Sequence, residues 1–194
     1  MKRLVAASIL FLLLQSCQKS KPALLPTAET RPAFITYTIE KNDHYSDRTN
    51  FQAFGKGELN FNVIFDSSAI YQTTSSINQS DINKLFGFSE GDDHQKNSAR
   101  IGWGWNKNAL RLYAYSYANG VRKFKEISTV QIGKEISCKI LVSGNQYQFE
   151  AAGTTVTLDR FIQGAVVPGY MLYPYFGGDE TAPHKITIRI MQIP

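Results

Sequence analysis

The chain has 194 residues, of which 43% are hydrophobic and 12% aromatic, and its formal net charge is +5. This length predicts one domain, and this apolar content is enough for a full core without disulfide or metal staples. Lys2 and Arg3 belong to the export signal described next, which carries no acidic residue, so the remainder carries only +3. That mild excess excludes a nucleic-acid-binding surface, and no nucleic-acid partner is expected.

The first residues have the anatomy of an export signal. A positively charged start is followed by the 11-residue, almost entirely apolar run Leu4–Leu14. The run is too short to span a bilayer, which takes about 20 apolar residues, but it fits the apolar region of a signal peptide. The next residues complete Leu14-Gln15-Ser16-Cys17, which resembles the lipobox of bacterial lipoproteins, with a less favoured residue at Gln15.

This resemblance implies that residues 1–16 are a signal peptide and that Cys17 carries the lipid. The protein is then expected in the bacterial cell envelope, at the outer membrane or cell surface. The lipid would hold it there, because two or more acyl chains anchor a protein stably. Residues 17–33 contain several prolines and are expected to form an extended tether. An ordinary secretory signal with an incidental cysteine is the alternative.

From residue 34 onward the hydrophobic period is 2, which predicts strands. Ser80–Phe86 is the one predicted helix, with its first serine as N-cap, and Asn119-Gly120 is a predicted hairpin turn. The predicted strands cover residues 34–39, 59–65, 99–105, 109–117, 122–127, 136–142, 146–151, 155–159, 170–176 and 185–193. Many short strands with short connections predict an all-β, two-sheet antiparallel jelly-roll sandwich over residues 34–194, with a closed barrel as runner-up.

Alternation along residues 109–118 separates leucines and alanines from one arginine and three tyrosines. Arginine is rarely buried without a partner, so the leucine face is predicted to form core and the other face to point outward. That outward face carries Arg111, Tyr113, Tyr115 and Tyr117.

The preceding strand, residues 99–105, is sorted in the same way. Its tryptophans suit the core, and Arg100 then points outward beside two glycines, Gly102 and Gly104, that leave a shallow floor or allow another backbone to approach. The same parity turns Gln148 outward on a later strand, and it places Cys138 in the core.

Exposed aromatic rings beside planar polar groups suit carbohydrate, because guanidinium and amide groups bind hydroxyls or a carboxylate in bidentate fashion. The predicted ligand-binding residues are Arg100, Arg111, Tyr113, Tyr115, Tyr117 and Gln148. The alternative is structural, since strand tyrosines also stabilise sheets through cross-strand contacts or pack under a loop.

Two acidic clusters are candidate metal sites. Asp159, Asp179 and Glu180 offer oxygen ligands for Ca²⁺, and residues 92–94 form a similar loop cluster. Neither has a regular metal-binding spacing, so solvated turns are expected and neither a metal nor a cofactor is predicted.

The strand rhythm of residues 99–194, with IGWGWNKNALRLYAYSYANG and YPYFGGDETAPHKITIRI, resembles the concanavalin A-like lectin/glucanase superfamily. The resemblance implies two curved sheets with carbohydrate on the concave one. The sequence lacks the E-x-D-x-x-E strand of the superfamily's glycosidases. It also lacks the R-x-E-x-R, Q-[IV]-H and Y-x-K-x-G-x-Y strands of its alginate lyases, so no catalytic residue carries over.

Three functions follow from these observations. The first is non-catalytic binding of a polysaccharide or oligosaccharide by a membrane-anchored lipoprotein. The second is a structural or assembly lipoprotein that binds another envelope protein. The third is a polysaccharide lyase in which Arg100 or Arg111 neutralises a uronate and His184 or Tyr115 transfers protons.

Overall fold

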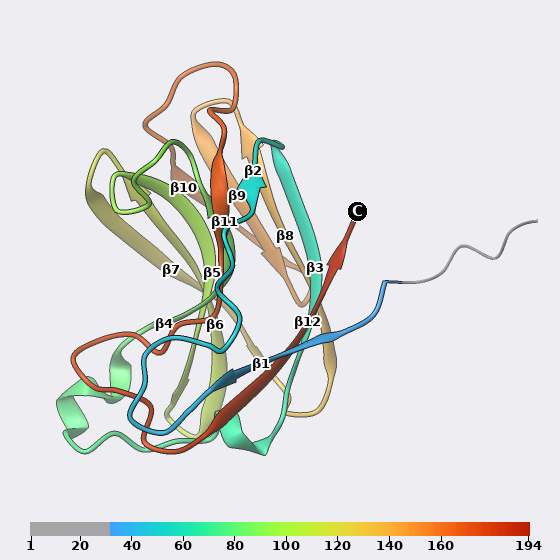
Figure 1. Cartoon of the computed structure of the whole chain (residues 1–194). Coiled ribbons are helices and arrows are strands. Elements are labelled where there is room, and N and C mark those ends of the chain that lie inside the picture. Colours follow the sequence, from blue (N-terminus) through green and yellow to red (C-terminus); the bar gives the residue numbers. More distant parts are fainter. Residues whose placement is uncertain (1–31) are drawn as a thin grey trace, which may run out of the picture. The chain divides into compact units, whose positions relative to one another are not determined.

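A computed structural model of the protein describes residues 32–194, whose strands form two facing antiparallel sheets (Figure 1). The first sheet has the order β1-β12-β3-β8-β9-β10. Its strands are β1 (Ile35–Ile39), β12 (Ile186–Ile193), β3 (Glu58–Phe65), β8 (Glu135–Ser143), β9 (Gln146–Ala151) and β10 (Thr154–Asp159).

The second sheet has the order β2-β11-β4-β5-β6-β7. Its strands are β2 (Ala53–Phe54), β11 (Gly169–Leu172), β4 (Asn83–Ser89), β5 (Asn97–Asn106), β6 (Ala109–Ala118) and β7 (Val121–Val130). Two short 3-10 helices, η1 (Ser67–Ala69) and η2 (Ser76–Ser80), lie between β3 and β4. The predicted all-β, two-sheet jelly-roll sandwich is confirmed, and because each sheet keeps two edge strands the closed barrel is wrong.

The core lies between the two sheets and is built by alternation. In β3, Leu59, Phe61, Val63 and Phe65 are buried while the residues between them are partly exposed. In β6, Leu110 and Leu112 are almost completely buried, which confirms the predicted parity of that strand. Burying apolar side chains on the inner faces is the main stabilisation of such a sandwich.

The predicted helix over Ser80–Phe86 is wrong, because β4 begins at Asn83 and only the short η2 precedes it. Strand β4 lies between β11 and β5, and all but one of its residues are buried. A strand covered on both faces loses the alternation that identifies it. An irregularity in the pairing with β5 between Lys84 and Phe86 disturbs the period further.

Two further predictions concern residues that the structure describes, and the remaining ones concern residues outside that region. Cys138 is buried in the core, as predicted, and Asn119-Gly120 forms the β6–β7 turn with positive φ at both residues. No helix in the described region is long and apolar enough to cross a membrane. The signal peptide, Cys17 and most of the tether lie outside the described residues.

Candidate functional site

The outer face of the second sheet carries most of the predicted binding residues. Antiparallel pairing of β5 with β6 places Arg100 opposite Tyr115 and Ser98 opposite Tyr117. Directly opposed side chains share a face, and the leucines of β6 occupy the inner one. The guanidinium and phenol groups therefore project from the sheet on the side away from the core.

One half of this outer face is covered. A Cβ added at Gly102 would lie 2.5 Å from Cγ2 of Ile82, and one at Gly104 would lie 3.4 Å from the carbonyl oxygen of Asp81. The two glycines thus allow another backbone, the segment before β4, to approach the sheet, as one of the two expectations had it, and the expectation of a shallow floor at these positions is wrong. Local alternation gives no information about this segment, because it arrives from a distant part of the chain.

Two predicted residues belong to the covered half. Arg111 donates from Nη1 to a carboxylate oxygen of Glu126 at 2.6 Å and from Nε to the carbonyl of Asn106 at 3.1 Å. Tyr113 lies opposite Gly102 and its ring approaches Gly104. Neither Arg111 nor Tyr113 lines the groove described next.

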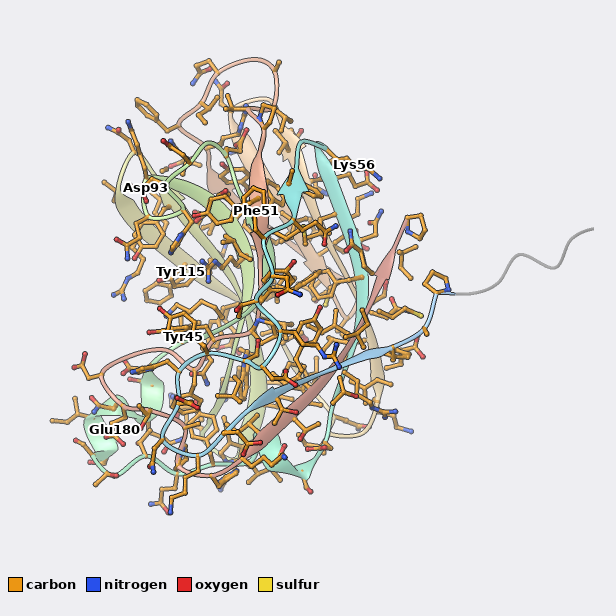
Figure 2. The ribbon with its side chains drawn as sticks, in the orientation of Figure 1. Tyr45, Phe51, Lys56, Asp93, Tyr115 and Glu180 are labelled. Atoms are coloured by element: carbon orange, nitrogen blue, oxygen red, sulfur yellow. The ribbon has the colours of Figure 1, made fainter. Side chains whose placement is uncertain are left out.

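The other half of the face forms an open groove of about 580 Å³. Figure 2 shows Tyr115 and Tyr45 between the turn that carries Asp93 and the loop that carries Glu180. The aromatic residues that line it are Tyr45, Phe51, Tyr115, Tyr117, Tyr170, Tyr173 and Tyr175. The cationic residues that line it are Lys84, Arg100 and Arg122, and within residues 32–194 no Asp or Glu joins them.

Arg100 forms the floor of the groove. Its side chain crosses β4 at Gly87, where an added Cβ would come within 2.9 Å of the arginine Cγ. The residue is only 9% exposed, yet no residue of the described region accepts a hydrogen bond from its guanidinium or forms an ion pair with it. Burial lowers the pKa of Arg100 to about 10, against an opposing effect of the surrounding phenols.

Lys84 lies beside it between two tyrosine rings. Its Nζ is 5.2 Å from the ring centre of Tyr115 and 5.8 Å from that of Tyr175, and it donates to the carbonyl of Ile82 at 2.9 Å. Cation–π contacts of this kind favour the charged form. Burial nevertheless lowers the pKa of Lys84 to about 8, and the nearby charge of Arg100 acts in the same direction.

Tyr115, Tyr117 and Arg122 complete the floor toward β7. The two tyrosine rings meet edge to face with centres 5.9 Å apart. Burial raises the pKa of Tyr115 above its ordinary value, and the neighbouring Tyr117 adds to that effect. Arg122 lies opposite Tyr117 across the β6–β7 hairpin and reaches over the ring of Phe124 at 5.8 Å.

The walls come from three loops. His94 and the hydroxyl of Tyr170 share a hydrogen bond of 2.9 Å, and burial lowers the pKa of His94. On another wall the rings of His44 and Tyr175 stack in parallel with centres 5.2 Å apart, and Tyr45 meets Tyr175 edge to face at 4.9 Å. These contacts fix the aromatic rings that border the groove.

Several candidate residues lie elsewhere. Gln148 is on β9 of the first sheet, between Tyr147 and Phe149, whose buried side chains point into the core. Its side chain therefore lies on the opposite outer face of the sandwich, and it does not belong with the other five residues. His184 is bound through Nε2 to the carbonyl of Ser68 and does not line the groove.

The acidic clusters have structural partners. Glu180 accepts hydrogen bonds from the backbone of Thr74 and Ser75 and from the amide of Asn78, while Asp159 pairs with Lys123 at 2.6 Å. Among residues 32–194, no group of three His, Cys, Asp or Glu side chains is arranged to hold a metal ion.

Three of the predicted residues, Arg100, Tyr115 and Tyr117, line the groove, as do Lys84 and Arg122, which were not predicted from the sequence. Lys84 lies inside the segment predicted as a helix, Ser80–Phe86, and that prediction gives no strand face for its side chain. Arg122 had a usable signal, because a two-residue Asn-Gly turn pairs the residues on either side and so places it opposite Tyr117.

Comparison with known proteins supports the fold. No protein-family model matches the sequence, and no curated protein sequence matches it. Among solved structures, a glycoside hydrolase family 16 endo-glucanase from Bacteroides ovatus aligns with a TM-score of 0.56 and 11% identity, over 84% of this chain and 81% of that one.

Two alginate lyases align similarly. The alginate lyase AlyC3 gives a TM-score of 0.55 and 13% identity over 82% of this chain and 74% of its own. The marine PL7 alginate lyase AlyA1 from Zobellia galactanivorans gives 0.54 and 10% over 91% and 83%. The chain therefore shares the two-sheet jelly-roll fold of this glucanase and these two lyases.

Proposed function

We propose that the groove binds carbohydrate, a polysaccharide or oligosaccharide, and that the protein is an envelope-anchored lipoprotein that does so without catalysis. The observation that carries this proposal is the set of seven aromatic side chains around one open groove. Aromatic faces pack against the C–H faces of sugar rings, and an aromatic cluster of this size around an open groove indicates a binding surface. The fold is shared with carbohydrate-active enzymes.

The composition of the groove supports the absence of hydrolysis. Glycosidases use a pair of carboxyl groups across the scissile bond, and no Asp or Glu within residues 32–194 lines this groove. The sequence also lacks the E-x-D-x-x-E strand of the related glycosidases.

Titration calorimetry tests the binding. Full-length protein in a sugar-free detergent is titrated with a panel of neutral and acidic polysaccharides. We expect at least one to bind, and Tyr115→Ala to weaken that binding about tenfold, which corresponds to ~1.4 kcal/mol. Tyr113→Ala is the matched control, because Tyr113 is on the same strand but outside the groove.

A second variant protects the test against misfolding. Tyr115 is buried, but Tyr45 is 68% exposed on the groove wall, so Tyr45→Ala removes a ring with little effect on the core. No binding across the panel, or affinity unchanged in both groove variants, contradicts the proposal.

Lyase activity is the second candidate, because Arg100 and Tyr115 share the groove floor, one able to neutralise a uronate and the other to transfer a proton. Its product carries a new carbon–carbon double bond conjugated with the carboxylate. If ultraviolet absorbance rises when the protein is incubated with uronate polymers, and Tyr115→Phe abolishes that rise, the protein is a lyase and the proposal of non-catalytic binding is wrong.

A further inference from the structure

The cations of the groove lack the acidic partners that several other cations of the described region have. Ion pairs join Arg111 to Glu126 and Lys123 to Asp159 on the surface, and Arg160 to Glu90 in the interior. In contrast, Lys84, Arg100 and Arg122 converge on a groove with no acidic residue in its lining. The groove is therefore a concentrated positive site.

Arg100 is the residue at which this lack of acidic partners is clearest. The residue is nine-tenths buried at the groove floor, and its guanidinium has no acceptor in the described part of the chain. Burying a charge without a partner is costly, and proteins normally pair such groups. The side chains around it, Tyr115, Tyr117, Tyr170 and Tyr175, are phenols, and no carboxylate lines the groove to balance its charge.

The surroundings hold Arg100 in a position suited to a ligand. Gly87 leaves room for its side chain to cross β4, and Lys84 and Arg122 flank the same groove. A planar guanidinium binds a carboxylate or a sulfate through two parallel hydrogen bonds. Such an acceptor would satisfy the donors that the chain leaves free.

We propose that the carbohydrate bound in this groove is anionic, and that a uronate carboxylate or a sulfate ester of the glycan binds at Arg100 between Lys84 and Arg122. This inference rests on the proposed function. It goes further by naming the chemical class of the glycan and by assigning Arg100 as the residue that determines specificity.

The test compares polymers that differ only in charge. Full-length protein is titrated with a polyuronate, with the same polymer after carboxyl reduction to neutral sugars, and with a sulfated galactan and its desulfated form. We expect one charged polymer to bind on the order of tenfold or more tightly than its neutral counterpart, and its affinity to fall as salt is raised. Which charged polymer binds identifies the carboxylate or the sulfate.

Arg100→Met tests the assigned residue. We expect this variant to bind the charged polymer no better than the neutral one, while its Tm rises because an uncompensated buried charge is removed. A purely structural arginine would instead give a lower Tm. Arg111→Met is the matched control, since that arginine is paired and lies outside the groove. If Arg100→Met does not fold, Arg122→Gln on the exposed edge strand is used instead. We expect it to lose the preference for the charged over the neutral polymer in the same way.

The outcomes separate the two proposals. Equal affinity for charged and neutral polymers overturns the anionic assignment and leaves carbohydrate binding intact. The assignment is also overturned if Arg100→Met still binds the charged polymer more tightly than the neutral one by the wild-type factor. If that variant does not fold, the same result in Arg122→Gln overturns it. Failure of the protein to bind any polymer, charged or neutral, overturns both.

Discussion

Glu90 and Arg160 form an ion pair that is closed to solvent, with both side chains 0% exposed. The guanidinium donates to both carboxylate oxygens at 2.7 Å, and the Tyr147 hydroxyl donates to the same group. The remaining N–H groups of the Arg160 guanidinium donate to three loop carbonyls. Because every donor is used, the pair holds the segment leading into β11 against the end of β4, and both strands contribute to the groove.

Breaking this pair is predicted to destabilise the protein. Arg160→Met leaves the Glu90 carboxylate buried without its cation, which costs about 3 to 5 kcal/mol in comparable buried pairs. Urea unfolding measures the free energy of unfolding directly. Arg111→Met is the control, because the partly exposed pair with Glu126 is expected to contribute about 1 kcal/mol or less. Equal losses in the two variants would contradict the prediction.

The same pair predicts a pH dependence. Burial by itself would raise the pKa of Glu90, but hydrogen bonds from Arg160 and Tyr147 outweigh it and hold that pKa below its usual range. The carboxylate therefore stabilises the fold above the unfolded-state pKa, and this contribution is lost as pH falls through the folded value. We expect the stability gap between wild type and Glu90→Gln to narrow from neutral pH toward about pH 3. A gap independent of pH would show that the charge of Glu90 is not responsible.

Arg100 shows how far sequence reasoning reaches at the scale of one residue. Alternation along β5 correctly predicts that its side chain leaves the sheet on the side away from the core. It does not predict that the residue is nearly buried there, because burial depends on loops that bring Tyr45, His94 and Tyr175 around it. Local patterning gives the direction of a side chain, whereas its depth depends on distant segments.

At the scale of elements, β7 is an edge strand of the second sheet. The register places Lys123 opposite Ser116 and Lys125 opposite Ala114, both on the core-facing side of β6. Charged residues that point inward on an edge strand hinder pairing with a second molecule. Phe124, 52% exposed on the other side of the strand, would favour such pairing if these charges were absent.

We therefore predict that Lys123→Ile combined with Lys125→Ile promotes self-association through β7. Size-exclusion chromatography with light scattering over a concentration series measures the mass. Lys56→Ile combined with Lys134→Ile removes the same charge from exposed positions outside the strands and should remain at the wild-type mass. If both double variants associate equally, net charge rather than the edge strand is responsible.

The elements that sequence reasoning missed share a physical cause. Strand β6 is half-buried, so its alternation is plain and its two faces are predicted correctly. Strand β4 is covered on both faces and irregularly paired, so its residues resemble a short helix. The segment before β4 covers Gly102 through long-range packing, and no local pattern records that contact.

At the scale of the whole molecule, the two outer faces of the sandwich differ. The second sheet carries the groove, walled by loops and lined with unpaired cations. The first sheet carries Gln148 and ion-paired side chains such as Lys139 with Glu58. The chain enters the described domain through β1, an edge strand of that first sheet. The groove and the first strand of the described domain therefore belong to different sheets.

This separation means that anchoring and binding should be independent, which Cys17→Ser tests. We predict that cells making this variant no longer retain the protein in the membrane fraction, because the thioether-linked lipid cannot form on serine. Acyl chains add about 0.8 kcal/mol per buried CH₂, and at least two are needed for stable anchoring. Fractionation locates the protein, and mass spectrometry of the wild-type amino terminus detects the diacylglycerol.

Polysaccharide affinity of the variant should equal that of wild type. Continued membrane retention with no lipid on Cys17 would instead indicate an ordinary signal peptide and another mode of attachment.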